Sequence, residues 1–529
     1  MLNKKVLFII DHIFYDWQKS IVDGFKAKNY ESLLYFSNND EKINRNYYFN
    51  FKKVDNSSLY EKYDFLPKEF KVSQNLIQQL EICHIINLSQ NPLGTQNIQD
   101  LEFYFFNFYF DNKFYSLNQV PLKNFSKIEA QVLFKKTNQK ISLLKKSIFP
   151  TFKDSPQKNY AFFNFILSDI LFSVIPIDKT LCNDHKNLNT LNEKINFKNF
   201  CIYYFSVALH KIILILKSVR NGFTYQKWNI AQIDQSVLEI NNAAPVLRKW
   251  LFNLPAFLSY ADPFLVLIKS RLFILFENFD FKTMRGKISM KEYTTNKVHD
   301  SGDNLIHIIG DDSHFSYPHP LSIKNELYFM TENSIHENLF LYKINDADDD
   351  TERFKISKKI KILSHANFVD PTPFFHDNIY WIFVGKHEPY TAGSSKLYLY
   401  FSEKYDGPYT EHIMSPIVTD ICSARSAGNI FIYNNKIIRP AQNCLNNYGN
   451  EINLMEITEL TTHTYSEKFY KKIISDQDYP DGCHHITVLD KIILIDGLKN
   501  KFSILIFFVK INYKIKLKCL QIKRYCTNK

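Results

Sequence analysis

Glycine is scarce in this sequence, with 13 residues among 529, about a third of the usual share of ~7 %. Only Gly24 and Gly94 precede residue 222, whereas ten glycines lie between Gly286 and Gly497. A chain of this length also exceeds the roughly 250 to 300 residues that one hydrophobic core can organise. The change in glycine use therefore predicts a domain boundary near residue 220.

Motifs for metals and dinucleotides are missing as well. The eight cysteines form no Cys-x-x-Cys pair and no ladder of short spacings, which excludes a zinc site of that kind and a secreted disulfide scaffold, so we expect reduced thiols. No His-Glu-x-x-His pattern occurs, so no ligand spacing supports a metal site, and a divalent ion among carboxylates and histidines of the C-terminal half stays open. The first apolar run leads into Ile10-Asp11-His12 instead of a glycine-rich loop, which excludes the usual dinucleotide cradle.

Long apolar runs are also few. The longest candidate, residues 201–216, is shorter than the ~20 residues needed to span a bilayer and carries His210 and Lys211 near its middle. It predicts a buried or interfacial helix and no transmembrane span. The apolar run at the N-terminus is only five residues long and lacks a small-residue cleavage site, unlike a secretory signal. We expect a cytoplasmic protein, and peripheral contact with a membrane stays open.

Charge is positive but thinly spread, because 65 Lys and Arg oppose 54 Asp and Glu for a net charge of +11. This balance suits an anionic partner such as a sugar phosphate. No RNA-binding signature with paired aromatics occurs, so nucleic acid is not an expected partner. The densest basic stretch, residues 510–518, alternates lysine with apolar residues and predicts a strand with one solvated face.

The N-terminal half predicts an α/β open sheet over residues 1–150. Apolar runs predict strands at 4–10, 32–36, 82–88 and 101–110, and helical spacing predicts helices at 16–28 and 159–175. The opening β-α-β unit should pair its strands in parallel with a right-handed crossover. Residues 151–225 are expected to form a helical connector.

The C-terminal half contains a repeat. Five apolar hairpins recur, at 264–277, 320–332, 373–384, 429–442 and 486–496. Each is followed by a further strand, which in the fifth copy is expected at 503–509. The residues just before the hairpins, at 262, 317, 370, 425 and 484, are separated by 55, 53, 55 and 59. This period predicts an all-β five-bladed β-propeller over residues 226–510, followed by a basic extension at 511–529.

Propeller geometry predicts a site where the inner strands begin. Residues at equivalent starts of five blades should converge at one mouth of the central channel. Each has an ordinary structural reading on its own, because Asp-Pro often starts a turn and a lone histidine is usually structural. Their shared placement predicts a functional cluster, whose members are Asp262, His314, Tyr317, His319, Asp370, Arg425, His484 and His485.

Asp262-Pro263 in blade one and Asp370-Pro371 in blade three resemble the five-bladed propellers of glycoside hydrolase family 43. The resemblance implies that the first aspartate is a general base, that the second tunes pKa and orients, and that a glutamate starting blade four is the general acid. Arg425 stands at the blade-four position here. A guanidinium cannot donate a proton at neutral pH, but it can bind a phosphate through two hydrogen bonds.

A second resemblance covers nearly the whole chain. It is carried by strings that include Tyr260-Ala-Asp-Pro-Phe264, Arg285-Gly-Lys-Ile288, His314-Phe-Ser-Tyr-Pro318, Ala424-Arg-Ser-Ala-Gly428, Arg439-Pro-Ala-Gln442 and Ile495-Asp-Gly497. These strings are similar to the propeller of proteins related to glucosamine inositolphosphorylceramide transferase. The resemblance implies that plant members place a glycosyltransferase domain after the propeller, whereas bacterial relatives place a formyltransferase-like α/β half before it, which is the arrangement expected here.

The N-terminal half departs from the formyltransferase pattern. That family uses an Asn-x-His segment, and this chain has Asn107-Phe108-Tyr109 where such a segment would fall. Tyrosine in place of histidine removes the acid-base group, so formyl transfer is not expected.

The leading hypothesis is a sugar-transfer enzyme or accessory in surface glycan or glycolipid assembly, with a nucleotide-sugar or a sugar phosphate as ligand. Asp262 would be the base or would accept a hydrogen bond from a sugar hydroxyl, Asp370 would be its partner, and Glu332 an alternative acid. Arg425 and Arg439 of blade four with His484 and His485 of blade five would form a cradle for a phosphate. The substrate-binding candidates are Glu277, His314, Tyr317, Arg425, Arg439, Gln442, His484 and His485. A glycan-binding scaffold without catalysis and a glycosidase- or phosphorylase-like enzyme are the alternatives.

Overall fold

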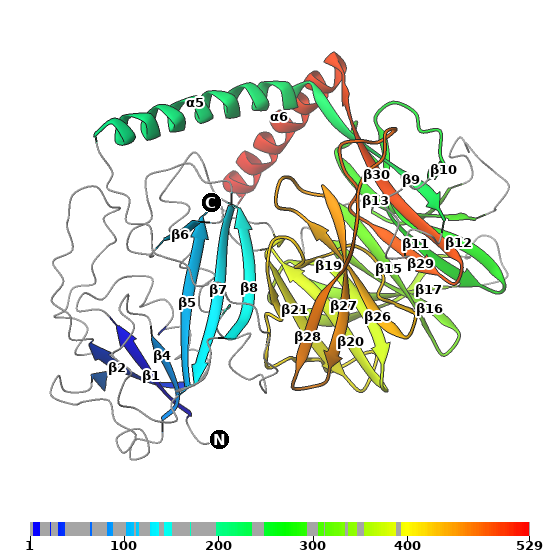
Figure 1. Cartoon of the computed structure of the whole chain (residues 1–529). Helices are drawn as coiled ribbons and strands as arrows, with labels where there is room; N and C mark the ends of the chain where they lie inside the picture. The colour runs from blue at the N-terminus through cyan, green and yellow to red at the C-terminus, as the bar shows by residue number, and fades with distance from the viewer. Residues whose placement is uncertain are drawn as a thin grey trace. The chain divides into compact units, whose positions relative to one another are not determined.

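A computed structural model of the chain divides into two compact units, Met1–Ile213 and Leu214–Lys529 (Figure 1). Apart from the single positions 22, 170 and 238, it describes residues 4–10, 30–36, 64–65, 82–87, 102–110, 113–115, 127–136, 142–150, 197–234, 248–293, 305–310, 313–333, 337–345, 354–387 and 393–527.

The first unit contains one mixed sheet in the order β3-β2-β1-β4-β5-β7-β8, with β6 paired to β5. Its strands are β1 Lys4–Ile10, β2 Tyr30–Phe36, β3 Asp64–Phe65, β4 Ile82–Asn87, β5 Glu102–Phe110, β6 Lys113–Tyr115, β7 Lys127–Lys136 and β8 Ser142–Pro150. The parallel pairing of β1 with β2 confirms the expected opening pair. The helices expected at 16–28 and 159–175 lie outside the described residues apart from Val22 and Ile170. The α/β and formyltransferase-like assignments therefore stay predictions.

The second unit is a five-bladed β-propeller, as predicted. Blade one is β11 Leu258–Ile268, β12 Arg271–Asp280, β13 Arg285–Glu292 and β14 Ile306–Ile309. Blade two is β15 Phe315–Ile323, β16 Glu326–Asn333, β17 Asn338–Ile344 and β18 Ile356–Ser364. Blade three is β19 Phe368–His376, β20 Ile379–Lys386, β21 Lys396–Ser402, β22 Thr410–Glu411 and β23 Val418–Thr419. Blade four is β24 Arg425–Ser426, β25 Phe431–Tyr433, β26 Lys436–Asn443, β27 Glu451–Leu460 and β28 Tyr465–Ile473.

Blade five closes the ring with strands from both ends of the propeller. It joins β29 Ile486–Leu489 and β30 Ile492–Phe502 to β9 Thr224–Ile233 and β10 Arg248–Trp250. β30 pairs with β9 in antiparallel register from Ile493↔Ile233 to Phe502↔Thr224. The prediction of a further strand at 503–509 is therefore wrong, because the first strand of the propeller fills that place.

The segment after blade five is the helix α6, Ile504–Thr527, so the strand predicted at 510–518 is also wrong. Lysine and apolar residues alternate there, but Ile506 is fully buried beside the partly buried Val509, a spacing that fits one helical face. A second helix, α5 Phe197–Gly222, precedes β9. Within the part of the chain that the structure describes, neither helix is long and apolar enough to cross a membrane.

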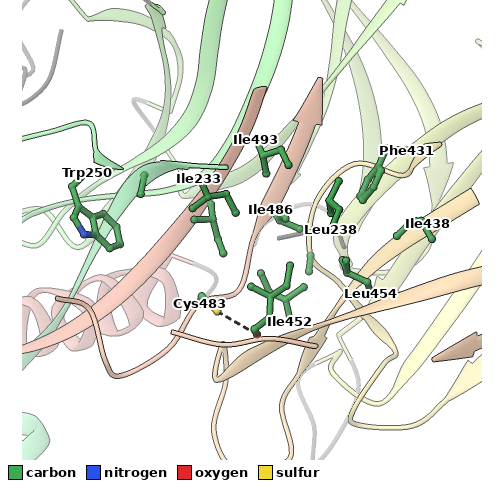
Figure 2. Close-up of a cluster of buried hydrophobic side chains, with 14 residues drawn as sticks. Ile233, Leu238, Trp250, Phe431, Ile438, Ile452, Leu454, Cys483, Ile486 and Ile493 are labelled. Carbon is green, nitrogen blue, oxygen red and sulfur yellow. Dashed lines mark hydrogen bonds between the residues drawn. The ribbon is translucent and has the colours of Figure 1, made fainter. Parts of the chain in front are cut away.

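The hydrophobic core lies between blades, because each small sheet can cover its faces only with its neighbours. Four buried apolar clusters each combine residues of two adjacent blades. In the cluster between blades four and five, Ile438 and Leu454 from one sheet lie near Ile486 and Ile493 from the other (Figure 2). This packing holds the inner strands in a fixed order around the ring.

Candidate functional site

Three inner strands start with the same irregularity. β11, β15 and β19 each shift register just after their first residues, and the bulged positions are Asp262, Tyr317 and Asp370. Their φ angles are 51°, 53° and 47°, in the left-handed region that residues other than glycine seldom adopt. Such strain persists only where the surroundings impose it and often marks functional sites.

The bulges free backbone N–H groups, and carboxylates of preceding blades accept them. Asp262 N–H donates to Asp496 Oδ2 at 3.4 Å, and Tyr317 N–H donates to Asp262 Oδ2 at 3.1 Å. Asp370 N–H donates to Glu332 Oε2 at 3.4 Å. The N–H groups of blades one, two and three thus donate to carboxylates of blades five, one and two, so each hydrogen bond joins a blade to the one before it. The bulges thus link neighbouring blades and fix the carboxylates at the start of the inner strands.

Asp262 is buried beside two histidines of blade five. His484 Nε2 and His485 Nδ1 each lie 3.5 Å from Asp262 Oδ1. Burial acts to raise the pKa of Asp262, but the hydrogen bond from His485, the charges of both histidines and the Tyr317 N–H outweigh it, so the pKa lies below its usual value. Asp262 is therefore a carboxylate throughout the physiological range.

His484 is held by Asp496, which the sequence analysis did not select. Asp496 is buried and accepts the backbone N–H groups of His484 and His485 at 2.9 and 3.0 Å, while its Oδ2 lies 2.5 Å from His484 Nδ1. Burial lowers the pKa of His484, but the charge and hydrogen bond of Asp496 raise it above the usual value. The available signal was an aspartate directly after an apolar strand, in Ile495-Asp-Gly497.

The pKa of a second carboxyl group, that of Glu332, is shifted in the opposite direction to the pKa of Asp262. Burial and the nearby charge of Asp370 raise the pKa of Glu332 to about 8, although Arg425 acts against this shift. Its side chain is 19 % exposed, and Arg425 Nη2 lies 4.0 Å from its Oε2. Glu332 is therefore mostly protonated at neutral pH.

Arg425 and Asp370 form a close ion pair next to Glu332. Arg425 Nε donates to Asp370 Oδ2 at 2.6 Å, and Gln442 Nε2 donates to the same oxygen at 3.3 Å. The guanidinium also lies over the ring of Tyr448, 4.7 Å from its centroid. Burial raises the pKa of Asp370, and Arg425 lowers it in part. Tyr448 is a further member of the site that sequence reasoning did not select.

Glu277 and His314 complete the cluster on the side of blade one. His314 Nε2 lies 3.7 Å from Glu277 Oε1, and His314 Nδ1 accepts the backbone N–H of Gly286 at 2.8 Å. A Cβ at position 286 would lie 2.7 Å from the carbonyl oxygen of Phe315 and would collide with Glu277, so only glycine fits there. Burial and the charge of Asp262 raise the pKa of Glu277 well above its usual value.

The structure thus brings together every predicted site residue except Arg439. The Arg439 guanidinium is fully buried within blade four, where it binds both carboxylate oxygens of Glu467 at 2.8 Å and the carbonyl oxygen of Ser423 at 2.7 Å. These contacts favour a structural role for Arg439, and its part in a phosphate cradle stays a prediction. His319, also expected at the channel, is buried, and burial lowers its pKa to about 3.

Tyr317 connects three blades by its hydroxyl group. The hydroxyl lies 2.8 Å from Thr372 Oγ1 of blade three and accepts the backbone N–H of Gly428 in blade four at 2.9 Å. We expect Tyr317→Phe to lower the free energy of unfolding by about 1–3 kcal/mol, because these buried partners lose a hydrogen bond. Chemical denaturation measures this change. Tyr328→Phe is the control, since its hydroxyl donates to Glu326 at 2.9 Å within the same strand, β16; an equal loss in both variants would contradict a bridging role.

One group of the described residues could hold a cation. Ligand atoms of Asp262, His484 and Asp496 all lie within 4.8 Å of one another, and all three residues are buried. Two carboxylates and an imidazole are ligands that divalent cations accept. The sequence predicted no metal, because these residues come from two distant segments and form no motif.

The propeller is similar to a known family. Residues 227–478 match the family model described as Glucosamine inositolphosphorylceramide transferase 1, N-terminal. The proteins named Glucosamine inositolphosphorylceramide transferase 1 from Oryza sativa subsp. japonica and Arabidopsis thaliana are 29 % identical to this chain over 214 residues. That stretch is 39 % of this chain but 27 % and 26 % of these proteins, so the chain spans about a quarter of the length of the relatives it matches.

Solved propeller structures are similar at low sequence identity. An exo-beta-1,3-galactanase from Clostridium thermocellum is 9 % identical, with a TM-score of 0.32 over 41 % of this chain and 50 % of that chain. An alpha-L-arabinanase from Cellvibrio cellulosa is 13 % identical, with a TM-score of 0.29 over 40 % of this chain and 77 % of that chain.

Proposed function

We propose that this cluster is a carbohydrate site at which a sugar is transferred to a hydroxyl acceptor. Asp262 takes the proton of the attacking hydroxyl, whose oxygen forms a bond to the anomeric carbon of the donor. The bond to the leaving group breaks, and Glu332 gives its proton to the departing oxygen. The observation that carries the proposal is the opposed protonation of these two carboxyl groups, since the pKa of Asp262 is lowered and that of Glu332 is about 8.

The charge of the cluster favours a sugar over a phosphate at its centre. It holds five carboxyl groups, against the single guanidinium of Arg425 and three imidazoles; the carboxyl groups are those of Asp262, Glu277, Glu332, Asp370 and Asp496, and the imidazoles those of His314, His484 and His485. Carboxylates accept hydrogen bonds from sugar hydroxyls, whereas they repel phosphate. The phosphate of an activated donor would therefore lie toward Arg425, beside the 42 %-exposed ring of Tyr448.

The relatives' names suggest the reactants. Glucosamine in those names suggests an amino sugar as the transferred group, and inositolphosphorylceramide suggests a lipid-linked inositol phosphate as acceptor. A nucleotide-sugar would supply the activated sugar. Transfer of a sugar in glycolipid or surface glycan assembly is therefore the proposed reaction. We propose that the protein acts where the acceptor lipid is found in the cell.

A panel of ligands tests this proposal. Nucleotide-sugars, the free sugars and the free nucleotides are added separately, and both melting temperature and sugar transfer to an inositol-phosphate lipid are measured. We expect one nucleotide-sugar to raise the melting temperature, because a ligand that binds only the folded chain stabilises it. Transfer should fall as pH rises through about 8, where Glu332 loses its proton, and should not fall between pH 5 and 7 because Asp262 stays ionised.

A glycan-binding scaffold is the second candidate. The ion pairs Arg425–Asp370 and His484–Asp496 already satisfy much of the cluster, and such fixed donors and acceptors also serve recognition alone. Stabilisation by free sugars without turnover of any donor would support this candidate. Release of free sugar into water would instead support a glycosidase, and release of a sugar phosphate would support a phosphorylase.

A further inference from the structure

α6 presents an apolar stripe to solvent. Ile504, Phe508, Ile511 and Ile515 recur at intervals of four, three and four residues, which is the spacing of one helical face, and all four are exposed. The opposite face holds the buried Ile506, which packs against Tyr225 and Phe281 of the propeller unit. The helix therefore packs on the propeller through one face, and the apolar stripe on the opposite face stays exposed to solvent.

The last turns of α5 also carry exposed apolar residues. All residues from 211 to 220 are exposed, and Leu216 and Val219, at 63 % and 57 %, are spaced on one helical face. A stripe of large apolar side chains in water is unfavourable by about 25 cal/mol for each Å² that a partner could cover. Such a stripe on a folded unit marks an interaction surface.

The ends of the two helices are fixed to each other. Phe223, just after α5, stacks on Phe507 of α6 with ring centroids 4.4 Å apart and planes at 8°. Lys510 Nζ donates to the carbonyl oxygens of Asn221 and Thr224 at 2.7 and 2.6 Å. The last turns of α5, from residue 214 on, and α6 thus both belong to the propeller unit and are held together there. We name Leu216, Val219, Ile504, Phe508, Ile511 and Ile515 the helical-pair surface.

Charge identifies the partner of this surface. Neither helix contains an aspartate or glutamate, whereas α5 contains three lysines and one arginine and α6 contains five lysines and one arginine. Lys217 and Arg220 of α5 and Lys514 and Lys516 of α6 are exposed beside the apolar stripes. A second copy of these helices would bring the same positive charge and be repelled. An anionic lipid surface supplies both negative headgroups and an apolar layer.

We propose that the helical-pair surface binds the surface of an anionic bilayer, with the apolar stripes in the interfacial layer and the flanking lysines at the headgroups. Both helices lie on the membrane and do not cross it. Long lysine side chains suit this position, because their stems cover apolar surface while their ammonium groups reach the phosphates. This inference goes beyond sugar transfer and needs no turnover for its test.

Flotation of the full chain with vesicles tests the proposal. We expect binding to phosphatidylcholine vesicles that contain about a third phosphatidylserine, and much weaker binding to phosphatidylcholine alone. Leu216→Gln with Phe508→Gln should weaken binding about tenfold or more, because two apolar side chains leave the interface. Lys217→Gln with Lys514→Gln should weaken it about fivefold for each charge removed. Added salt should weaken the wild type and affect the lysine variant less.

The matched control is Ile432→Gln. Ile432 is 64 % exposed on β25 in blade four, so its change removes an equally exposed apolar side chain outside the helical-pair surface. It should leave vesicle binding unchanged, and the melting temperatures of all variants should match that of the wild type. Absence of wild-type flotation, or equal flotation of both double variants and wild type, overturns the proposal. A wild-type dimer without vesicles that the apolar variant dissociates would also overturn it in favour of self-association.

Discussion

Asp262→Asn should abolish most sugar transfer while leaving the fold and donor binding nearly intact. Asparagine keeps an acceptor oxygen for the Tyr317 N–H but loses the charge that faces His484 and His485. General-base catalysis contributes about a hundred- to ten-thousandfold to a rate, so kcat should fall by that order with KM changed only a few-fold. The measurement is steady-state transfer with the donor that the ligand panel selects, at pH 7.

Asp377→Asn is the matched control for this variant. Asp377 stands in the turn between β19 and β20, has a positive φ angle as Asp262 does, and its side chain is 78 % exposed. We expect wild-type rates from it. An Asp262→Asn protein that turns over at the wild-type rate would remove Asp262 as the base. Equal loss of kcat and of donor-induced stabilisation would assign Asp262 to substrate binding instead.

The pKa of His484 should respond to the same substitution. Asp262 is one of the charges that raise the pKa of His484, after Asp496. Loss of the Asp262 charge should therefore lower the pKa of His484, which NMR titration of the histidine ring can follow. This readout separates an electrostatic role of Asp262 from a purely structural one, because a structural change would also disturb the contact between His484 and Asp496.

The position of the cluster could be predicted because the start of each blade is marked by a local sequence pattern. The Asp-Pro pairs at 262 and 370 precede apolar hairpins of similar length, and a propeller places such starts around one axis. The left-handed bulges at these positions could not be predicted in the same way, because they depend on carboxylates of neighbouring blades such as Asp496. The residues that start each blade can thus be found from the local sequence. The protonation states of the cluster cannot, because they depend on contacts between blades that form only in the assembled ring.

Two other features depended on contacts far apart in the sequence. Blade five takes β9 from the start of the propeller, and no local pattern in β30 specifies that partner. For α6, lysines and apolar residues alternate over a short stretch, and the pattern satisfies both the period of a strand and the period of a helix. Packing of Ile506 against Tyr225 and Phe281 favours the helix, and this contact is visible only in the folded unit.

Arg439→Met should destabilise the propeller strongly without a direct effect on donor recognition. The Arg439 and Glu467 side chains are 1 % and 8 % exposed, and Glu467 also accepts the hydroxyl of Tyr465 at 2.5 Å. Removal of the guanidinium leaves a buried carboxylate without its cation, which costs about 3–5 kcal/mol of unfolding free energy. Urea denaturation of the variant and the wild type measures this loss.

The double variant Arg439→Met with Glu467→Gln distinguishes the buried pair from the phosphate cradle that the sequence suggested. Glutamine removes the uncompensated charge and can still accept the Tyr465 hydroxyl, so much of the lost stability should return. Donor affinity should then match the wild type, because the contacts of Arg439 lie with Glu467 and the carbonyl oxygen of Ser423. If stability returned but donor affinity stayed low, Arg439 would contribute to the site after all, and the assignment of phosphate to Arg425 would have to be revised.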